Sequence, residues 1–208
     1  LAEVKRACAL VNCELGLLHD DKASAIIEAA TEVMSGRHQQ DFPLSVWQTG
    51  SGTHTNMNLN EVLANRANVL LGKEIGVGYV DAHDHCNIGQ SSNDTIPTAL
   101  HVSTALGLHE HLLPVLRQLA ASLQAKSQEF DDILKSGRTH LQDAAPVRLG
   151  QEFGGYARQV EFCVRRTEEA REALLELALG GTAVGTGLNA HPDFAKQTIA
   201  RLAKESGL

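Results

Sequence analysis

The sequence has 208 residues, of which 43% are apolar and only 4% aromatic, a composition typical of a helical protein packed with Leu, Ala and Val. Its formal net charge is −7 without a cluster of Lys and Arg, which argues against a nucleic-acid partner or an acidic membrane surface. The four cysteines lack C-x-x-C spacing and no apolar stretch reaches about 18 residues, so we expect no metal site, no membrane span and a location in the cytoplasm or an organelle matrix.

Short helices separated by loops are expected in the first 88 residues. Asp20 and Asp21 suit the first turn of a helix, and Gly36 and Gly72 suit helix ends. The pattern predicts helices at 2–18, 21–34 and 56–71, an extended passage at 41–47, and an irregular connection at 73–88.

Two long helices follow. Apolar residues recur every three, four or seven positions from Pro97 to about residue 125 and again from Pro146 to about residue 178. We expect a kink at Pro114. A glycine-rich run at 179–189 is either a linker or a loop whose backbone approaches a ligand, and 194–206 is expected to be helical.

These elements predict an all-α fold, a bundle of long antiparallel helices with a smaller, mostly helical N-terminal part. We expect residues 1–88 to form the N-terminal part. Residues 89–208 would form the helical bundle domain, incomplete at its C-terminal end.

Three polar segments carry the strongest functional signal: the first covers 48–56, the second 89–94 and the third 137–143. Each is expected to open a helix, where unpaired N–H groups and roughly half a positive charge can hold an anion. Ser, Thr, Asn and Asp are also ordinary capping residues, so one such segment alone is weak evidence. Their density, with Ser51, Thr53 and Asn56 in one turn, favours binding of a small dianion.

The chemistry of these segments depends on neutral groups. Residues 48–58 and 87–98 contain no Lys or Arg, and no P-loop or dinucleotide fingerprint is present, so no cofactor is expected. His140, inside the third polar segment, is the best candidate for proton transfer near neutral pH. His54 is ambiguous because it lies in the first polar segment, and His101, His109 and His111 on the long helix are expected to be solvated or capping residues.

The polar segments resemble the motifs of class II fumarases, members of the fumarase/aspartase superfamily. The similar strings, in the same order and covering essentially the whole chain, are Thr49–Asn58 (TGSGTHTNMN), Gln90–Asp94 (QSSND), Gly137–Asp143 (GRTHLQD) and Gly180–Asn189 (GGTAVGTGLN). The resemblance implies reversible hydration of fumarate to L-malate through an aci-carboxylate intermediate, without metal or cofactor.

The resemblance also implies a homotetramer whose active sites combine loops from three subunits. One subunit would contribute Ser51, Gly52, Thr53 and Asn56 to substrate binding, a second Ser91, Ser92 and Asn93, and a third Thr139 together with the catalytic His140.

Two departures from the family pattern stand out. The family's later signature, a mobile loop that carries the presumed catalytic base, is absent, so we expect a chain a little short of half a subunit and inactive alone. An accessory carboxylate site usually has His-Pro-x-Asp before the second polar segment. Here the aligned residues run from Asp81 to Asp84, which leaves His83 and Asp84 as the accessory-site candidates.

Two other functions compete. Aspartate ammonia-lyase shares the architecture but typically has Gln in place of His140, and superfamily lyases for larger substrates match the glycine-rich string less well. A non-enzymatic helical assembly module would need only the apolar helix faces, so it would not require His140 or the polar segments.

Overall fold

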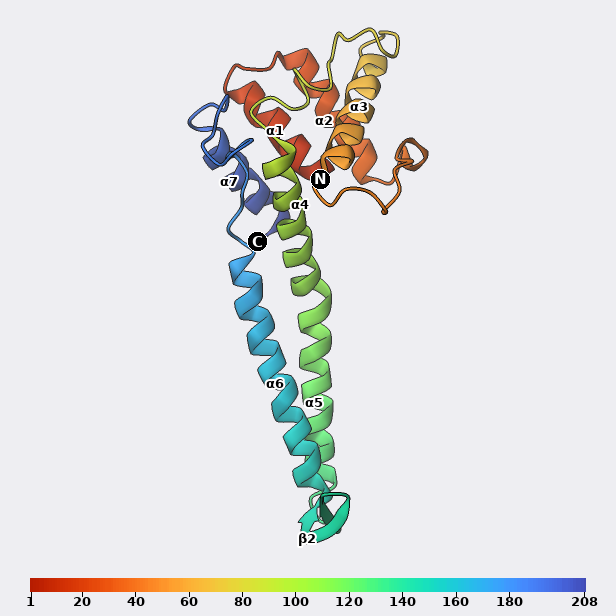
Figure 1. Ribbon diagram of the computed structural model, residues 1–208, viewed down its shortest axis with the longest axis vertical. Coiled ribbons are helices and arrows are strands. Elements are labelled where there is room, and N and C mark those ends of the chain that lie inside the picture. The colour runs from red at the N-terminus through yellow and green to blue at the C-terminus, as the bar shows by residue number, and fades with distance from the viewer. The chain divides into compact units, whose positions relative to one another are not determined.

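The computed structural model describes residues 1–208 and consists of helices joined by loops, with one small hairpin (Figure 1). This confirms the expected all-α class. No helix combines the length and apolarity needed to cross a membrane. In chain order the elements are α1 (Ala2–Glu14), α2 (Asp20–Met34), the 3₁₀ helix η1 (Gln39–Asp41), α3 (Thr53–Leu70), α4 (Ser92–Gly107), the π-helical turn η2 (Leu108–Leu112), α5 (Leu113–Glu129), β1 (Leu134–Thr139), β2 (Gln142–Arg148), α6 (Leu149–Ala173) and α7 (Phe194–Ser206).

Glycines end the first helices. Gly36 and Gly72 follow α2 and α3 with φ of 85° and 69°, as expected from the sequence. Helix α1 is shorter than the predicted 2–18, because Gly16 adopts φ 72° and its N–H donates to the Cys13 carbonyl at 2.9 Å. The Leu17 N–H completes this Schellman motif by donating to the Asn12 carbonyl at 2.8 Å.

The chain divides into two compact units, Leu1–Val102 with Leu177–Leu208, and Ser103–Glu176. This division differs from a boundary at residue 88, because the start of α4 is tied into the first unit. The Asp94 carboxylate accepts hydrogen bonds from backbone N–H groups beyond residue 177, and α7 packs against α1.

Helix α1 is the centre of the first unit, with α2 and α7 packed against it (Figure 1). The spacing of Val4, Cys8 and Val11 places them on one face, in a cluster with Phe194 and Leu202 of α7. The opposite face, with Ala2 and Ala9, belongs to a second cluster formed with α2, α3 and the connection at 80–88. Burial on two faces explains why α1 carries small and apolar residues around most of its circumference.

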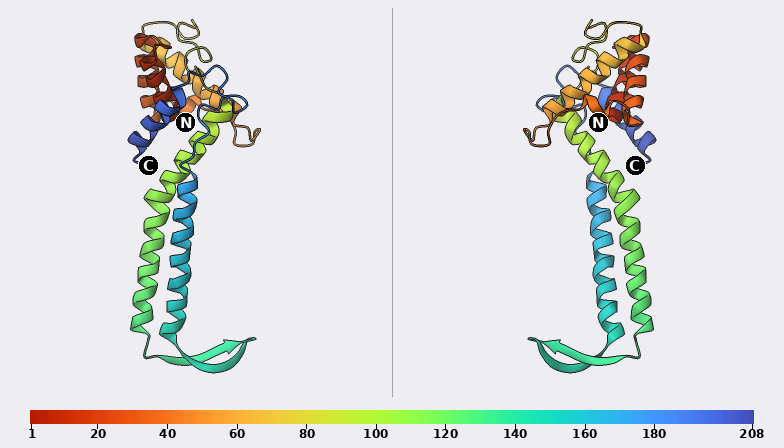
Figure 2. Two further views of the ribbon diagram at one scale, coloured as in Figure 1. Left: turned by 90° about the vertical axis from the view of Figure 1, so that its left-hand side faces the viewer. Right: turned by 90° about the vertical axis from the view of Figure 1, so that its right-hand side faces the viewer.

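The second unit is a long helical hairpin. Helices α5 and α6 lie side by side in both views of Figure 2, with the two strands beyond their ends. Edge-to-face contacts place the ring centroid of Phe153 at 5.2 Å from that of Phe130 and 5.9 Å from that of Tyr156. Very few apolar side chains here are fully buried, namely Ala105, Leu113 and Ala157. Its apolar surface is therefore only partly covered within this chain.

The expected kink at Pro114 corresponds to a change of helix type. The π-helical turn η2 ends two residues before this proline. A proline lacks the N–H for the carbonyl four residues earlier, and its ring crowds that carbonyl. That carbonyl belongs to Glu110 inside η2, so the widened turn accommodates the proline.

The expectation that the third polar segment opens a helix is wrong. Residues 137–143 form the end of an antiparallel hairpin, in which Thr139 of β1 pairs with Gln142 of β2. Helix α6 therefore begins at Leu149, after β2, rather than near Pro146. His140 and Leu141 occupy the two-residue turn with φ of 49° and 62°. The pattern lacked the Asn-Gly or Asp-Gly pair that ordinarily marks such a turn.

Candidate active site

The first and second polar segments meet inside the first unit. Asn56 on α3 is fully buried, and its Nδ2 donates to Ser92 Oγ at 2.9 Å, at the start of α4. The same nitrogen lies 3.4 Å from Asn87 Oδ1, and Thr95 Oγ1 donates to Asn56 Oδ1 at 3.3 Å. Asn56 is thus bonded to its own chain and holds Ser92 in place.

Gly52 allows the two helix starts to approach each other. Its φ of 72° lies in the left-handed region, and a Cβ atom added there would lie 2.7 Å from Cγ2 of Ile96 on α4. Ser51 Oγ lies 3.4 Å from Thr53 Oγ1, and both residues are exposed. Their hydroxyl groups therefore face solvent within this chain.

The start of α4 combines a cap with exposed donors. The Ser91 N–H donates to Asp94 Oδ1 at 2.9 Å, and the Asn93 N–H lies 3.2 Å from Ser91 Oγ. Ser91 and Asp94 therefore have the capping role that their residue types suggest. The Ser92 side chain is not needed for this cap.

The glycine-rich run is attached to the same helix start. Asp94 Oδ2 accepts the backbone N–H of Gly180 at 3.1 Å and that of Thr182 at 2.9 Å. Asn93 Nδ2 donates to the Ala183 carbonyl at 2.7 Å. These contacts favour the loop interpretation over the linker interpretation.

These elements surround a hollow of about 510 Å³, which we call the polar hollow. Its lining contains no Lys or Arg, so an anion there would be held by amide, hydroxyl and backbone donors. The lining residues are Met57, His83, Asp84, Asn87, Ile88, Gly89, Gln90, Ser91, Ser92, Thr182, Ala183, Leu188 and Asn189.

The accessory-site candidates lie at the rim of the polar hollow. His83 Nδ1 is 3.1 Å from Asp84 Oδ1, and both side chains are exposed. Asp81 Oδ1 accepts the backbone N–H groups of Asp84 at 2.8 Å and His83 at 2.7 Å, and these bonds lower the pKa of Asp81. The rim therefore carries the carboxylate of Asp84, which disfavours an anionic ligand at that point.

Thr139 and His140 belong to the second unit and are exposed at the hairpin turn. Two successive residues with positive φ give a type I′ turn, which is strained for side chains other than Gly, Asn or Asp. No hydrogen bond within the chain holds the His140 ring, whereas Arg138 Nε lies 3.3 Å from Asp143 Oδ1 beside it. The ring is therefore available to a partner outside this chain.

Sequence reasoning missed Lys5. Its side chain is 1% exposed, and its Nζ donates to Asn87 Oδ1 and to Gln90 Oε1, both at 2.9 Å. Burial lowers the pKa of Lys5 to about 8, against the opposing influence of nearby thiol and carboxyl groups. The one signal in the sequence was a lysine among the apolar residues of α1, beside Val4 and Cys8, which belong to a buried cluster.

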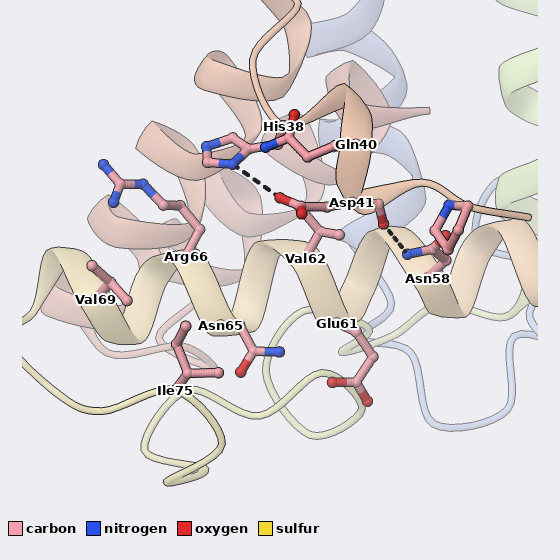
Figure 3. A pocket seen from close by; sticks show the side chains of 11 residues that line it. His38, Gln40, Asp41, Asn58, Glu61, Val62, Asn65, Arg66, Val69 and Ile75 are labelled. Carbon is pink, nitrogen blue, oxygen red and sulfur yellow. Dashed lines mark hydrogen bonds and ion pairs between the residues drawn. The ribbon is translucent and has the colours of Figure 1, made fainter.

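A larger hollow of about 620 Å³ lies beside α3, and no residue of the three polar segments lines it (Figure 3). Val62, Val69 and Ile75 contribute to its wall. Its Arg66 donates to Glu32 through Nε at 2.6 Å and Nη2 at 2.8 Å, which lowers the pKa of Glu32 to about 2, with a smaller contribution from His38. None of the predicted site residues lines it, and its Arg66 is already paired with Glu32.

Comparison with known proteins decides the family. The family model described as lyase matches residues 1–208. This chain belongs to the lyase family. Among its relatives, the class II fumarate hydratase of Nitrosomonas europaea is 57% identical over 208 residues, covering 100% of this chain and 45% of the relative. That of Halobacterium salinarum is 55% identical, covering 100% and 44%.

Solved structures of lyases support the same family. A class II fumarase from Schistosoma mansoni superposes with a TM-score of 0.95 at 42% identity, covering 99% of this chain and 43% of that one. A fumarate lyase:delta crystallin from Brucella melitensis bound to cobalt gives a TM-score of 0.93 at 40% identity, covering 100% and 45%. The lyase chain thus spans less than half the length of the proteins that it matches.

Proposed function

We propose that the protein to which these residues belong is a fumarate hydratase that interconverts fumarate and L-malate. One contrast carries the proposal: the polar hollow offers only neutral donors to a dianion, and His140 is presented unbonded at a strained turn. Relatives named class II fumarate hydratase, at 55–57% identity, support this assignment.

The donors of the first unit would hold the substrate carboxylates. Ser91, Ser92 and Asn93 lie at the N-terminus of α4, where backbone N–H groups and the helix dipole favour an anion. Preorganised donors of this kind stabilise charge that develops during a reaction. They would therefore stabilise the aci-carboxylate formed when a base removes the proton next to a carboxylate. The base itself is not assigned to a residue of this chain.

His140 would act on the hydroxyl group that leaves malate, or on the water that adds to fumarate. Its exposure suits a general acid or base that must reach a substrate held elsewhere. Thr139 beside it would contribute a hydroxyl to substrate binding. Because Asn56 is fully buried, we assign it to holding Ser92, while Ser51 and Thr53 remain candidates for direct contact.

A homotetramer with shared active sites would bring His140 to the polar hollow of another copy. The second unit exposes Leu112, Val115 and Leu119 on its helices and Leu141 at its turn, with exposures from 42% to 96%. Exposed apolar patches on this scale favour association. The free thiols are consistent with the cytoplasm or an organelle matrix.

The test is the reaction itself, followed in the purified full-length protein by loss of the ultraviolet absorbance of fumarate and by detection of malate. Aspartate is the matched control substrate, because an aspartate ammonia-lyase would release ammonia from it. Ammonia release without malate formation would reject fumarate hydration in favour of the second reaction.

Residues 1–208 alone should be inactive and should self-associate. Light scattering and a fumarate assay on the same sample test both points. A monodisperse monomer would contradict the proposed use of the apolar surface. Turnover by residues 1–208 alone would contradict the need for residues outside this chain.

A further inference from the structure

We propose that Lys5 is a positioning residue for the polar hollow, which holds Asn87 and Gln90 in place in its wall and places a positive charge behind a hollow that has no Lys or Arg of its own. The inference rests on the proposed function, in that the ligand is a small dicarboxylate. It assigns the recognition of that dianion partly to a side chain on α1, far from the polar segments in the sequence.

Asn87 Oδ1 is the centre of the network. It accepts Lys5 Nζ at 2.9 Å and Asn60 Nδ2 at 3.2 Å, with Asn56 Nδ2 at 3.4 Å. Through Asn56, the network reaches Ser92 Oγ at 2.9 Å. Three donors around one amide oxygen connect α1, α3 and the start of α4, so the position of Ser92 depends on Lys5 through the half-buried Asn87 and the buried Asn56.

Lys5 also decides which way the two amides point. Because it takes the oxygens of Asn87 and Gln90, their nitrogens turn to the loop: Asn87 Nδ2 donates to the Gln90 carbonyl at 3.2 Å. Gln90 Nε2 donates to the carbonyls of Cys86 and Ile88, each at 3.2 Å. Without the ammonium group, both amide oxygens would lose a charged donor and either amide could rotate.

The charge of Lys5 is not neutralised by an ion pair. Its Nζ donates to two uncharged amides, and the groups that face it are Cys8 on α1, Cys86 in the connection and Asp94 on α4. Burial raises the pKa of both thiols to about 12, so they stay neutral, and the Asp94 oxygens are bonded to backbone N–H groups. A dianion in the polar hollow would therefore meet a positive charge behind Asn87 and Gln90.

This charge should disappear in a pH range that can be measured. Because burial lowers the pKa of Lys5 to about 8, the ammonium group is present at neutral pH and is lost as the pH rises through that value. Substrate affinity should fall over the same range. Arginine stays protonated there, so it keeps the charge and a fork of donors.

The experiment measures kcat/KM for fumarate against pH in the full-length protein, as wild type, Lys5→Arg and Lys5→Met, with melting curves on the same samples. The control is Ile26→Val, which alters the buried core of the first unit but no member of the network. In the wild type we expect kcat/KM to decline above pH 8 and to level off about 10- to 100-fold lower once Lys5 is neutral. In Lys5→Arg the decline of kcat/KM should move to higher pH. Lys5→Met should lower kcat/KM about 10- to 100-fold at neutral pH.

Several results would overturn the inference. One is a wild-type kcat/KM that does not decline near pH 8. Another is a decline in Lys5→Arg at the same pH as in the wild type. A third is a folded Lys5→Met with the kcat/KM of the wild type. If Lys5→Met does not fold, the pH at which kcat/KM declines in Lys5→Arg decides the question. Every other titrating group is common to Lys5→Arg and the wild type. A wild type that releases ammonia from aspartate instead would reject the proposed function alone, and the same shift would then be measured on that reaction.

Discussion

The polar hollow and the hairpin turn hold their functional side chains in opposite ways. In the polar hollow, Asn56 and Lys5 are buried and bonded to several elements of the same chain. At the turn, His140 and Leu141 are exposed, strained in φ and without a side-chain hydrogen bond. The side chains of the polar hollow are held by contacts within the first unit, whereas those of the turn face solvent.

This difference separates two tasks. Binding a dianion needs donors that are fixed before the ligand arrives, and a connected interior network supplies that order. A side chain that acts on a substrate bound elsewhere must instead project from its own unit. Mutations of the buried network behind the polar hollow should therefore lower both stability and substrate binding, whereas mutations at the turn should lower activity with little loss of stability.

The largest effect is expected for His140→Asn in the full-length protein. General acid or base groups contribute about 10²–10⁴ in rate, so turnover should fall by two to four decades. The melting temperature should stay unchanged, because the ring has no partner to lose and Asn tolerates a positive φ. Steady-state kinetics and melting on one preparation check both statements.

Turnover within a few-fold of wild type would remove His140 from the chemistry. A lower melting temperature with turnover per folded molecule preserved would show that the ring is buried in the assembly as a structural residue. Either result would show that the turn does not present a catalytic side chain, and the contrast with the polar hollow would no longer hold.

The next effect is expected for Asn56→Ala, which removes a buried amide and leaves Ser92 Oγ without its partner at 2.9 Å. The free energy of unfolding should fall by about 1–3 kcal/mol, because buried polar groups are left unsatisfied. Ser51→Ala is the matched control in the first polar segment, where an exposed hydroxyl group changes stability by no more than about 0.5 kcal/mol. Chemical denaturation of the two variants gives the comparison.

Equal stability losses in both variants would contradict the interior role of Asn56. A large effect of Ser51→Ala on KM with no effect on stability would support Ser51 as a direct substrate contact. Chemical denaturation and steady-state kinetics together thus divide the first polar segment into a supporting residue and a binding residue.

Much of the helical framework could be predicted from the sequence, because it depends on local signals. Gly36 and Gly72 end helices through their own backbone freedom, and the apolar spacing beyond Pro97 reflects one buried face. The hairpin could not be predicted, since His140 and Leu141 form the turn in place of the Asn-Gly or Asp-Gly pair that ordinarily marks it. The surrounding structure, and not the local sequence, decides that turn.

The candidate site shows the same limit. The density of hydroxyls and amides indicated which segments matter, but not that Asn56 would be buried against Ser92. Nor could the sequence show that Lys5 lies behind the polar hollow, because that contact joins residues 82 and 85 positions apart. Long-range packing of this kind carries no local pattern.

The smallest effect is expected for Leu141→Gly, which separates the strain of the turn from the use of its apolar side chain. A residue with a Cβ atom at φ 62° costs about 1 kcal/mol relative to glycine, so amide exchange in β1 and β2 should slow about fivefold. Leu141→Ala is the matched control, because it removes the apolar side chain and keeps the strain, and its exchange should not slow. If Leu141, now 96% exposed, packs against another copy in the active assembly, both variants should weaken self-association equally, as measured by light scattering. Unchanged association in both would show that the turn is held in its strained form for His140 alone.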